Sequence, residues 1–134
     1  MNREIKFRIY DKATKQIIYN PELEFVNLTG GGYIKRFLLP PDYFIVRAKE
    51  EEEFDIMQFT GCYDRNKKEI YEGDIFKCKS GNIYEVIFWS CGFWLSPINQ
   101  CYEGYELQLL HDQNALGEVI GNKFENNELL EEGI

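Results

Sequence analysis

The amino-acid sequence predicts a mostly β fold with minor helix. Apolar and polar residues alternate with a period of two at several places along the 134 residues, and polar turn residues separate these runs. Hydrophobic residues make up 44% of the chain and aromatic residues 16%, which is more large apolar surface than a disordered chain carries. We therefore expect an α+β chain dominated by strands, with an amino-terminal β-hairpin region packed on a small SH3-like β-barrel in the carboxyl-terminal part.

The amino-terminal region begins with a predicted hairpin. Apolar side chains occupy every second position of residues 5–10, as in a half-buried strand. Asp11 can then start a turn by accepting a hydrogen bond from its own backbone, and residues 17–19 form the returning strand. Two more strands are expected over residues 23–28 and 33–39, on either side of three glycines. The glycines indicate a hairpin tip, because the Lys and Ser or Thr of a phosphate-binding loop do not follow them.

The composition changes at residues 49–55, KEEEEFD. Four consecutive glutamates repel one another and stay solvated, which is typical of a linker or an exposed turn. We therefore divide the chain into a hairpin region over residues 1–53, a small β-barrel over 54–125, and a short helical turn with a frayed tail over 126–134. These three parts can also pack as one compact unit.

The strands of the predicted barrel follow one another through tight turns. They include Phe59 and residues 69–78, 83–89, 105–110 and 118–120. Gly92 interrupts the run that begins at residue 83, and the apolar residues 93–95 then continue it. Five or six such strands are enough to curl into a barrel.

Three residues inside this region, Glu72, Gly73 and Asp74, carry a structural signal. Gly73 suits a sharp bend with positive φ, and Asp74 can accept hydrogen bonds from nearby backbone amides. The trio therefore indicates the start of a strand rather than an acid–base pair.

The cysteines and the single histidine do not form a recognisable reactive site. Cys62, Cys78, Cys91 and Cys101 include no closely spaced pair of the kind that binds zinc, so we expect four reduced thiols that fill space near strands. His111 lies in LLHDQN, which we interpret as a solvated loop, although a dyad of His111 with a cysteine stays open. We expect no metal and no cofactor.

An enzyme is not expected. The sequence contains none of the short motifs that mark dinucleotide binding, phosphate binding, zinc proteases or serine hydrolases. With 23 acidic residues present, two carboxylates that lie close together by chance are no sign of a glycosidase. No residue is therefore predicted to be catalytic.

The aromatic residues of the barrel region are the remaining functional candidates. In residues 83–89, the alternate set that includes Phe88 is uniformly apolar and is predicted to face inward, so Trp89 faces outward. Flat exposed rings can fill a partner's pocket or stack on single-stranded bases. Our candidates for such an interface are Trp89, Trp94 and Tyr105.

The charge of the chain bears on its partners. The formal net charge of −8 opposes nonspecific attraction to nucleic acid or anionic lipid, although lysines and arginines gather in the first hairpin and again over residues 65–68. The sequence shows no export signal and no apolar run long enough to cross a membrane, so we expect a soluble cytoplasmic protein without a membrane partner.

Three segments carry a resemblance to a known family. They are REIKFRIYDKATK at residues 3–15, MQFTGCYDRNKKEIYEGDI at 57–75 and EVIGNKFENNELL at 118–130. Together they resemble the YopX family of phage and prophage proteins over most of the chain. The resemblance implies a setting in the cytoplasm of a bacterial host and names no activity or catalytic residue.

These observations together favour a noncatalytic phage or prophage accessory protein that binds another protein. Unpaired strand edges also favour a homo-oligomer. The alternative is a nucleic-acid-related module, which either binds single strands or mimics the acidic face of DNA to occupy a host enzyme.

Overall fold

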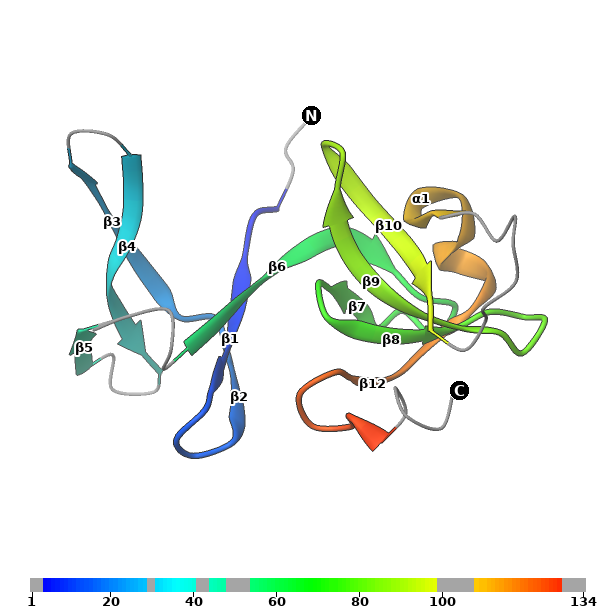
Figure 1. Ribbon diagram of the computed structural model, residues 1–134, viewed down its shortest axis with the longest axis horizontal. Coiled ribbons are helices and arrows are strands. Elements are labelled where there is room, and N and C mark those ends of the chain that lie inside the picture. The colour runs from blue at the N-terminus through cyan, green and yellow to red at the C-terminus, as the bar shows by residue number, and fades with distance from the viewer. Residues whose placement is uncertain (1–3, 29–30, 41–43, 48–53, 99–107, 129–134) are drawn as a thin grey trace. The chain divides into compact units, whose positions relative to one another are not determined.

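The computed structural model describes residues 4–28, 31–40, 44–47, 54–98 and 108–128. Over these residues the protein is mostly β, with twelve strands, the one-turn helix α1 and a single 3-10 turn (Figure 1). This confirms the predicted fold class. The chain forms two compact units, one of Lys6–Met57 and the other of Gln58–Ile134 with Met1–Ile5, so that the strand β6 (Phe54–Tyr63) belongs to both. The predicted division at residues 53 and 125 stays a prediction.

The unit formed by Lys6–Met57 contains two antiparallel groups of strands. The first is the predicted hairpin of β1 (Phe7–Asp11) and β2 (Gln16–Tyr19), in which Ile9 lies opposite Ile18. The second is a three-stranded sheet in the order β3-β4-β5. Its strands are β3 (Glu22–Leu28), β4 (Gly31–Leu39) and β5 (Phe44–Arg47).

The predicted turn chemistry recurs in both units. In the β1–β2 turn, Asp11 Oδ1 accepts a hydrogen bond from Ala13 N at 3.0 Å, and Lys15 has a φ of 58°. In the turn between β6 and β7 (Glu69–Tyr71), Asp64 Oδ1 accepts from the N–H two residues on at 2.8 Å, and Lys67 has a φ of 65°. An aspartate that ties down its own turn is thus the common solution in two separate hairpins.

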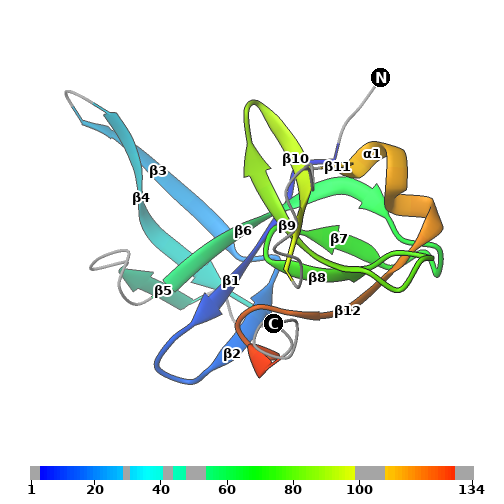
Figure 2. The same ribbon diagram turned by 45° about the vertical axis from the view of Figure 1, so that its right-hand side comes forward.

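The larger unit is built on a five-stranded antiparallel sheet in the order β11-β10-β9-β8-β12 (Figure 2). Its strands are β8 (Asp74–Lys77), β9 (Ile83–Trp89), β10 (Gly92–Pro97), β11 (Gln108–Leu109) and β12 (Glu118–Asn122). The helix α1 (Leu110–Gln113) lies against β10 and β11 and is followed by a 3-10 turn (Asn114–Leu116). The SH3-like strand arrangement stays a prediction.

One apolar cluster forms the core of this unit. It draws side chains from β7, β8, β9, β10 and α1, and its members are Ile70, Phe76, Tyr84, Val86, Leu95 and Leu110. Phe76, Ile70 and Leu95 have no solvent-exposed surface. Burial of a side chain of this size stabilises a fold by about 2 kcal/mol, so the cluster is a main source of the unit's stability.

Residues 69–78 form the strands β7 and β8, with the predicted sharp bend at Gly73 between them. Two other predicted elements differ from the structure. Of the strand predicted over residues 105–110, only Gln108 and Leu109 are described as a strand, and Leu110 begins α1. Gly92 does not interrupt a strand but starts β10, since the chain reverses direction just before it.

Candidate interaction site

Among the described residues of the larger unit, the most exposed aromatic side chains lie at the turn end of the β9–β10 hairpin. This end extends beyond the other strands of the unit (Figures 1 and 2). Trp89 lies opposite Gly92, Phe88 opposite Phe93, and the turn between the strands consists of two residues. We call Phe88, Trp89, Phe93 and Trp94 the aromatic end.

The turn itself has an unusual sequence for its backbone. Ser90 has a φ of 47° and Cys91 a φ of 62°, the left-handed pair that a type I′ turn requires. Such turns favour Asn and Gly, and a serine or cysteine in this region costs about 1 kcal/mol or more. The hairpin therefore holds a mildly strained turn next to its exposed rings.

The strand β9 continues past the core, and this exposes its last two side chains. Tyr84 and Val86 are buried in the core as predicted, but Phe88 on the same face is 55% exposed. Phe88 lies on the same face of β9 as Tyr84 and Val86, as predicted. The prediction that its side chain is buried is wrong. Phe88 instead contacts Phe93 edge to face, with ring centroids 5.3 Å apart.

The opposite face of the hairpin carries the tryptophan pair. Trp89 is 55% exposed and contacts Trp94 edge to face, with ring centroids 6.0 Å apart. A Cβ added at Gly92 would lie 3.5 Å from Trp94 Nε1, an ordinary contact distance, so the packing of the two indoles does not depend on a glycine there. The Trp94 Nε1 atom is buried and has no hydrogen-bond partner among the described residues.

The structure thus brings together two of the three predicted interface residues. Trp89 and Trp94 form one ring pair, whereas Tyr105 lies outside the described residues. Phe88 and Phe93 belong to the same end but were not predicted as interface residues. A two-residue turn at Ser90 and Cys91 fixes the hairpin register that places Phe88 opposite Phe93. Predicting that turn from the sequence would therefore have identified the phenylalanine pair.

Glu72, Gly73 and Asp74 have the structural role that the sequence indicates. Glu72 Oε1 accepts a hydrogen bond from Gln58 N at 3.0 Å, and Asp74 Oδ2 accepts from Tyr71 N at 2.8 Å. Gly73 has a φ of 82° and donates its N–H to Val86 O at 2.8 Å. The trio fastens the bend between β7 and β8 to its neighbours.

His111 and the carboxylate next to it lie at the surface. His111 lies in α1 rather than in the predicted loop, and its side chain is 83% exposed. Its Nδ1 atom is 3.8 Å from Asp112 Oδ1, which is also largely exposed. Within the described ranges, no group of three or more His, Cys, Asp or Glu side chains is arranged to hold a metal ion.

The three described cysteines are free thiols in two kinds of surroundings. Cys62 and Cys78 pack against the core, and this burial raises the pKa of both thiols, with a hydrogen bond to Thr60 partly opposing the shift at Cys62. Cys91 instead lies exposed in the hairpin turn, so the prediction that it fills space is wrong. Cys101 lies outside the described residues.

Cys91 should therefore be modified well before Cys62 and Cys78. In a Cys101→Ser background at pH 8, we expect a disulfide reagent to modify Cys91 roughly tenfold faster than the other two, because the thiolate is the reacting form and burial disfavours it. The rates for Cys62 and Cys78 should keep rising with pH and level off only above their raised pKa values. Mass spectrometry of peptides at successive times measures the three rates, and equal rates would contradict the assigned burial.

Comparisons with known proteins agree with this architecture. The YopX protein family model matches residues 6–131. The solved structure of protein EF1440 from Enterococcus faecalis has 21% sequence identity and a TM-score of 0.64, and the match covers 96% of this chain and 99% of that one. Protein yopX from Bacillus subtilis has 21% identity and a TM-score of 0.58, with 92% and 96% covered. No curated protein matches the chain.

The fold and the site together define a β-rich protein of two units that displays an aromatic hairpin end. The match over residues 6–131 shows that the chain belongs to the YopX family, as its sequence resemblance indicated. In the described part of the chain, no helix has the length and apolar character needed to cross a membrane.

Proposed function

We propose that this chain is a noncatalytic accessory protein of a phage or prophage that binds a partner protein through the aromatic end. The observation that carries the proposal is that Phe88 and Trp89 are each 55% exposed at the end of one hairpin. Monomeric proteins seldom gather large exposed rings in one place, and interfaces are enriched in them.

The size of the exposed surface is sufficient for a binding anchor. A buried Phe or Trp covers 150–250 Å², so the exposed halves of these two rings amount to about 200 Å². The two rings lie on opposite faces of the hairpin, so a partner gains this whole area only if it covers both faces. At about 25 cal/mol/Å², such a partner gains about 5 kcal/mol, compared with about 8 kcal/mol for a micromolar complex. The rings also keep a fixed geometry, because each contacts its neighbour on β10, and a preformed anchor loses little side-chain entropy on binding.

The noncatalytic part of the proposal is supported by the geometry of the titratable groups. The side chains of His111 and Asp112 are largely exposed to solvent. The buried carboxylates of Asp74 and Asp64 accept hydrogen bonds from backbone amides. The bacterial cytoplasm as location and a homo-oligomeric state belong to the same proposal. Size-exclusion chromatography with light scattering measures the oligomeric state. A protein that stays monomeric at all concentrations would contradict the proposed homo-oligomer.

Replacement of the exposed rings should remove the partner without unfolding the protein. We expect Phe88→Ser with Trp89→Ser to weaken binding by roughly 30-fold or more, because exposed aromatic anchors contribute at least 2 kcal/mol. The measurement is capture of the tagged full chain from nuclease-treated bacterial lysate, followed by titration of the recovered partner against both proteins.

The matched control is Leu116→Ser, which removes an exposed apolar side chain elsewhere in the same unit. It should leave the titration unchanged. Equal binding by the Phe88/Trp89 variant, with an unchanged melting temperature, would contradict the assigned surface, and turnover of a substrate by the pure protein would contradict the noncatalytic role.

A further inference from the structure

A second surface of the larger unit is cationic, although the chain as a whole is acidic. Two segments contribute to it, the β6–β7 turn and the end of β8 with the turn that follows. Every lysine and arginine in these segments is exposed. We call these residues the cationic face, and they are Arg65, Lys67, Lys68, Lys77 and Lys79.

The start of β12 brings the two segments together. Arg65 N donates a hydrogen bond to Gly117 O at 2.9 Å, and its Nη2 atom is 3.3 Å from Glu118 Oε2. Glu118 lies directly opposite Lys77 in the β8–β12 pair, and opposite residues of an antiparallel pair point to the same face. Arg65 and Lys77 therefore flank one carboxylate on one side of the sheet.

Most carboxylates near these cations accept hydrogen bonds from backbone N–H groups or form an ion pair. Asp64 and Asp74 are 4% and 2% exposed and accept hydrogen bonds from backbone N–H groups. Glu72 accepts a backbone N–H, Glu118 is held by its ion pair, and Glu69 is half-buried. The lysines and arginines of these segments are therefore more exposed than the carboxylates near them, on a chain whose net charge is −8.

An exposed ring, that of Tyr63, lies two residues before Arg65 in the chain. Tyr63 is 41% exposed and immediately precedes the Asp64 turn. Its ring contacts Phe59 edge to face at 5.6 Å, and its carbonyl oxygen accepts a hydrogen bond from Asn114 Nδ2 at 2.7 Å. A positioned ring next to several cations is the combination that single-stranded nucleic acids require, because bases stack on the ring while phosphates contact the cations. An acidic peptide would bind the cations but would not require the exposed ring, so the ring favours a nucleic acid as the ligand.

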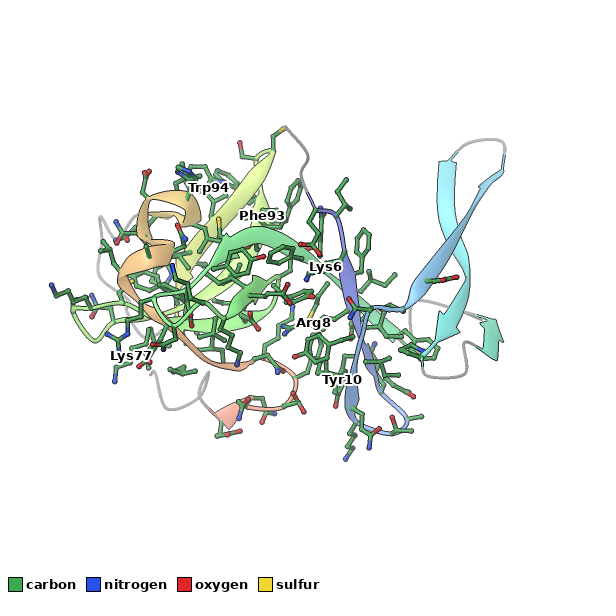
Figure 3. The ribbon with its side chains drawn as sticks, turned by 180° about the vertical axis from the view of Figure 1, so that it is seen from behind. Lys6, Arg8, Tyr10, Lys77, Phe93 and Trp94 are labelled. Atoms are coloured by element: carbon green, nitrogen blue, oxygen red, sulfur yellow. The ribbon has the colours of Figure 1, made fainter. Side chains whose placement is uncertain are left out.

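We propose that the cationic face binds single-stranded nucleic acid, with Arg65 and Lys77 contacting phosphates and Tyr63 stacking on a base. The site is separate from the aromatic end. Lys77 lies opposite Ile83 at one end of β9, whereas Trp89 ends the same strand, about 20 Å away. Figure 3 shows Lys77 and Trp94 at opposite edges of this unit.

The test is the binding of a fluorescently labelled oligothymidylate to the full chain, measured by anisotropy over a series of salt concentrations. We expect Arg65→Gln with Lys77→Gln to weaken binding more than tenfold at low salt. The slope of log affinity against log salt should fall by roughly 1.4, since each phosphate contact on a single strand contributes about 0.7. Tyr63→Ala should weaken binding about fivefold or more and leave that slope unchanged.

The matched control is Lys12→Gln with Lys15→Gln, which removes the same charge from the β1–β2 turn. Its effect should stay within about threefold, because it removes charge from residues outside the proposed site, together with the exposed Lys12–Asp55 ion pair. Absence of binding at low salt, an equal loss in this control, or full competition by polyglutamate would overturn the proposal. The Phe88/Trp89 variant should bind the oligonucleotide with unchanged affinity. The proposal for the cationic face is therefore tested separately from the proposal for the aromatic end.

Discussion

Asp64→Ala is expected to lower the free energy of unfolding of the larger unit by about 3–4 kcal/mol. Asp64 is buried, and its carboxylate accepts backbone hydrogen bonds from Asn66, Lys68 and Val119 at 2.8–2.9 Å. The first two bonds close the β6–β7 turn, and the third ties that turn to β12. Removal of the carboxylate leaves three backbone donors to find other partners, which accounts for the size of the effect. Urea unfolding followed by tryptophan fluorescence measures it.

The β1–β2 turn provides the matched control for this prediction. Asp11 starts that turn in the same way, but its carboxylate is exposed at the surface and accepts one described backbone bond, from Ala13. Asp11→Ala should therefore cost only about 0.5–1 kcal/mol. Asp64→Asn keeps one acceptor oxygen and should fall between the two. If Asp64→Ala costs no more than Asp11→Ala, the bond to Val119 does not have the importance assigned to it.

Gly117→Ala is expected to lower the free energy of unfolding by about 2–3 kcal/mol. An added Cβ would lie 2.4 Å from Lys77 O and 2.6 Å from Phe76 Cε1. The first of these is backbone and the second belongs to a fully buried ring, so neither can move aside without shifting β8 against β12. Gly117 has an extended backbone with a φ of −136°, so the cost is steric. Thermal and urea unfolding of the purified variant measure it.

Gly92→Ala is the corresponding control. The nearest atom to its added Cβ would be Trp94 Nε1 at 3.5 Å, an ordinary contact distance. We expect a change within about 0.5 kcal/mol for this variant. A Gly117→Ala protein as stable as the Gly92→Ala protein would show that β8 and β12 do not pack as closely as described. That result would also weaken the cationic face, since Gly117 positions Arg65 next to Lys77.

Much of the fold could be predicted because its signals are local. The strand predicted over residues 83–89 is β9 to the residue, since its apolar alternation and β-branched and aromatic content agree. The two aspartate turns could likewise be predicted, because an aspartate side chain that bonds to its own turn involves only neighbouring residues.

The candidate site could be predicted only in part, because it depends on register and on where the core ends. Alternation placed Trp89 on the outer face, but the contact of Trp89 with Trp94 requires the hairpin register, and Ser90 and Cys91 lack the usual composition of its turn. Phe88 lies on the predicted face yet projects past the core, which no pattern within one strand reveals.

The remaining features depend on contacts between distant parts of the chain. Asp64 reaches Val119, 55 residues away, and this bond unites the turn with β12. Arg65 and Lys77 likewise become neighbours only because β12 lies between their segments. Such pairings are invisible to the composition and periodicity of a single sequence, so the cationic face could not be predicted beyond the clustering of lysines and arginines.

Photo-crosslinking from position 88 tests whether the aromatic end contacts a partner protein. A benzophenone side chain replaces Phe88 in the full protein within bacterial cells, and a second protein carries the same group at Ser80, which is exposed in the β8–β9 turn. The account predicts a nuclease-resistant, discrete protein adduct from position 88 that is lost with Trp89→Ser and absent from position 80. Equal labelling at both positions, or no adduct at position 88 while the partner is still captured, would contradict the assignment of the aromatic end as the binding surface.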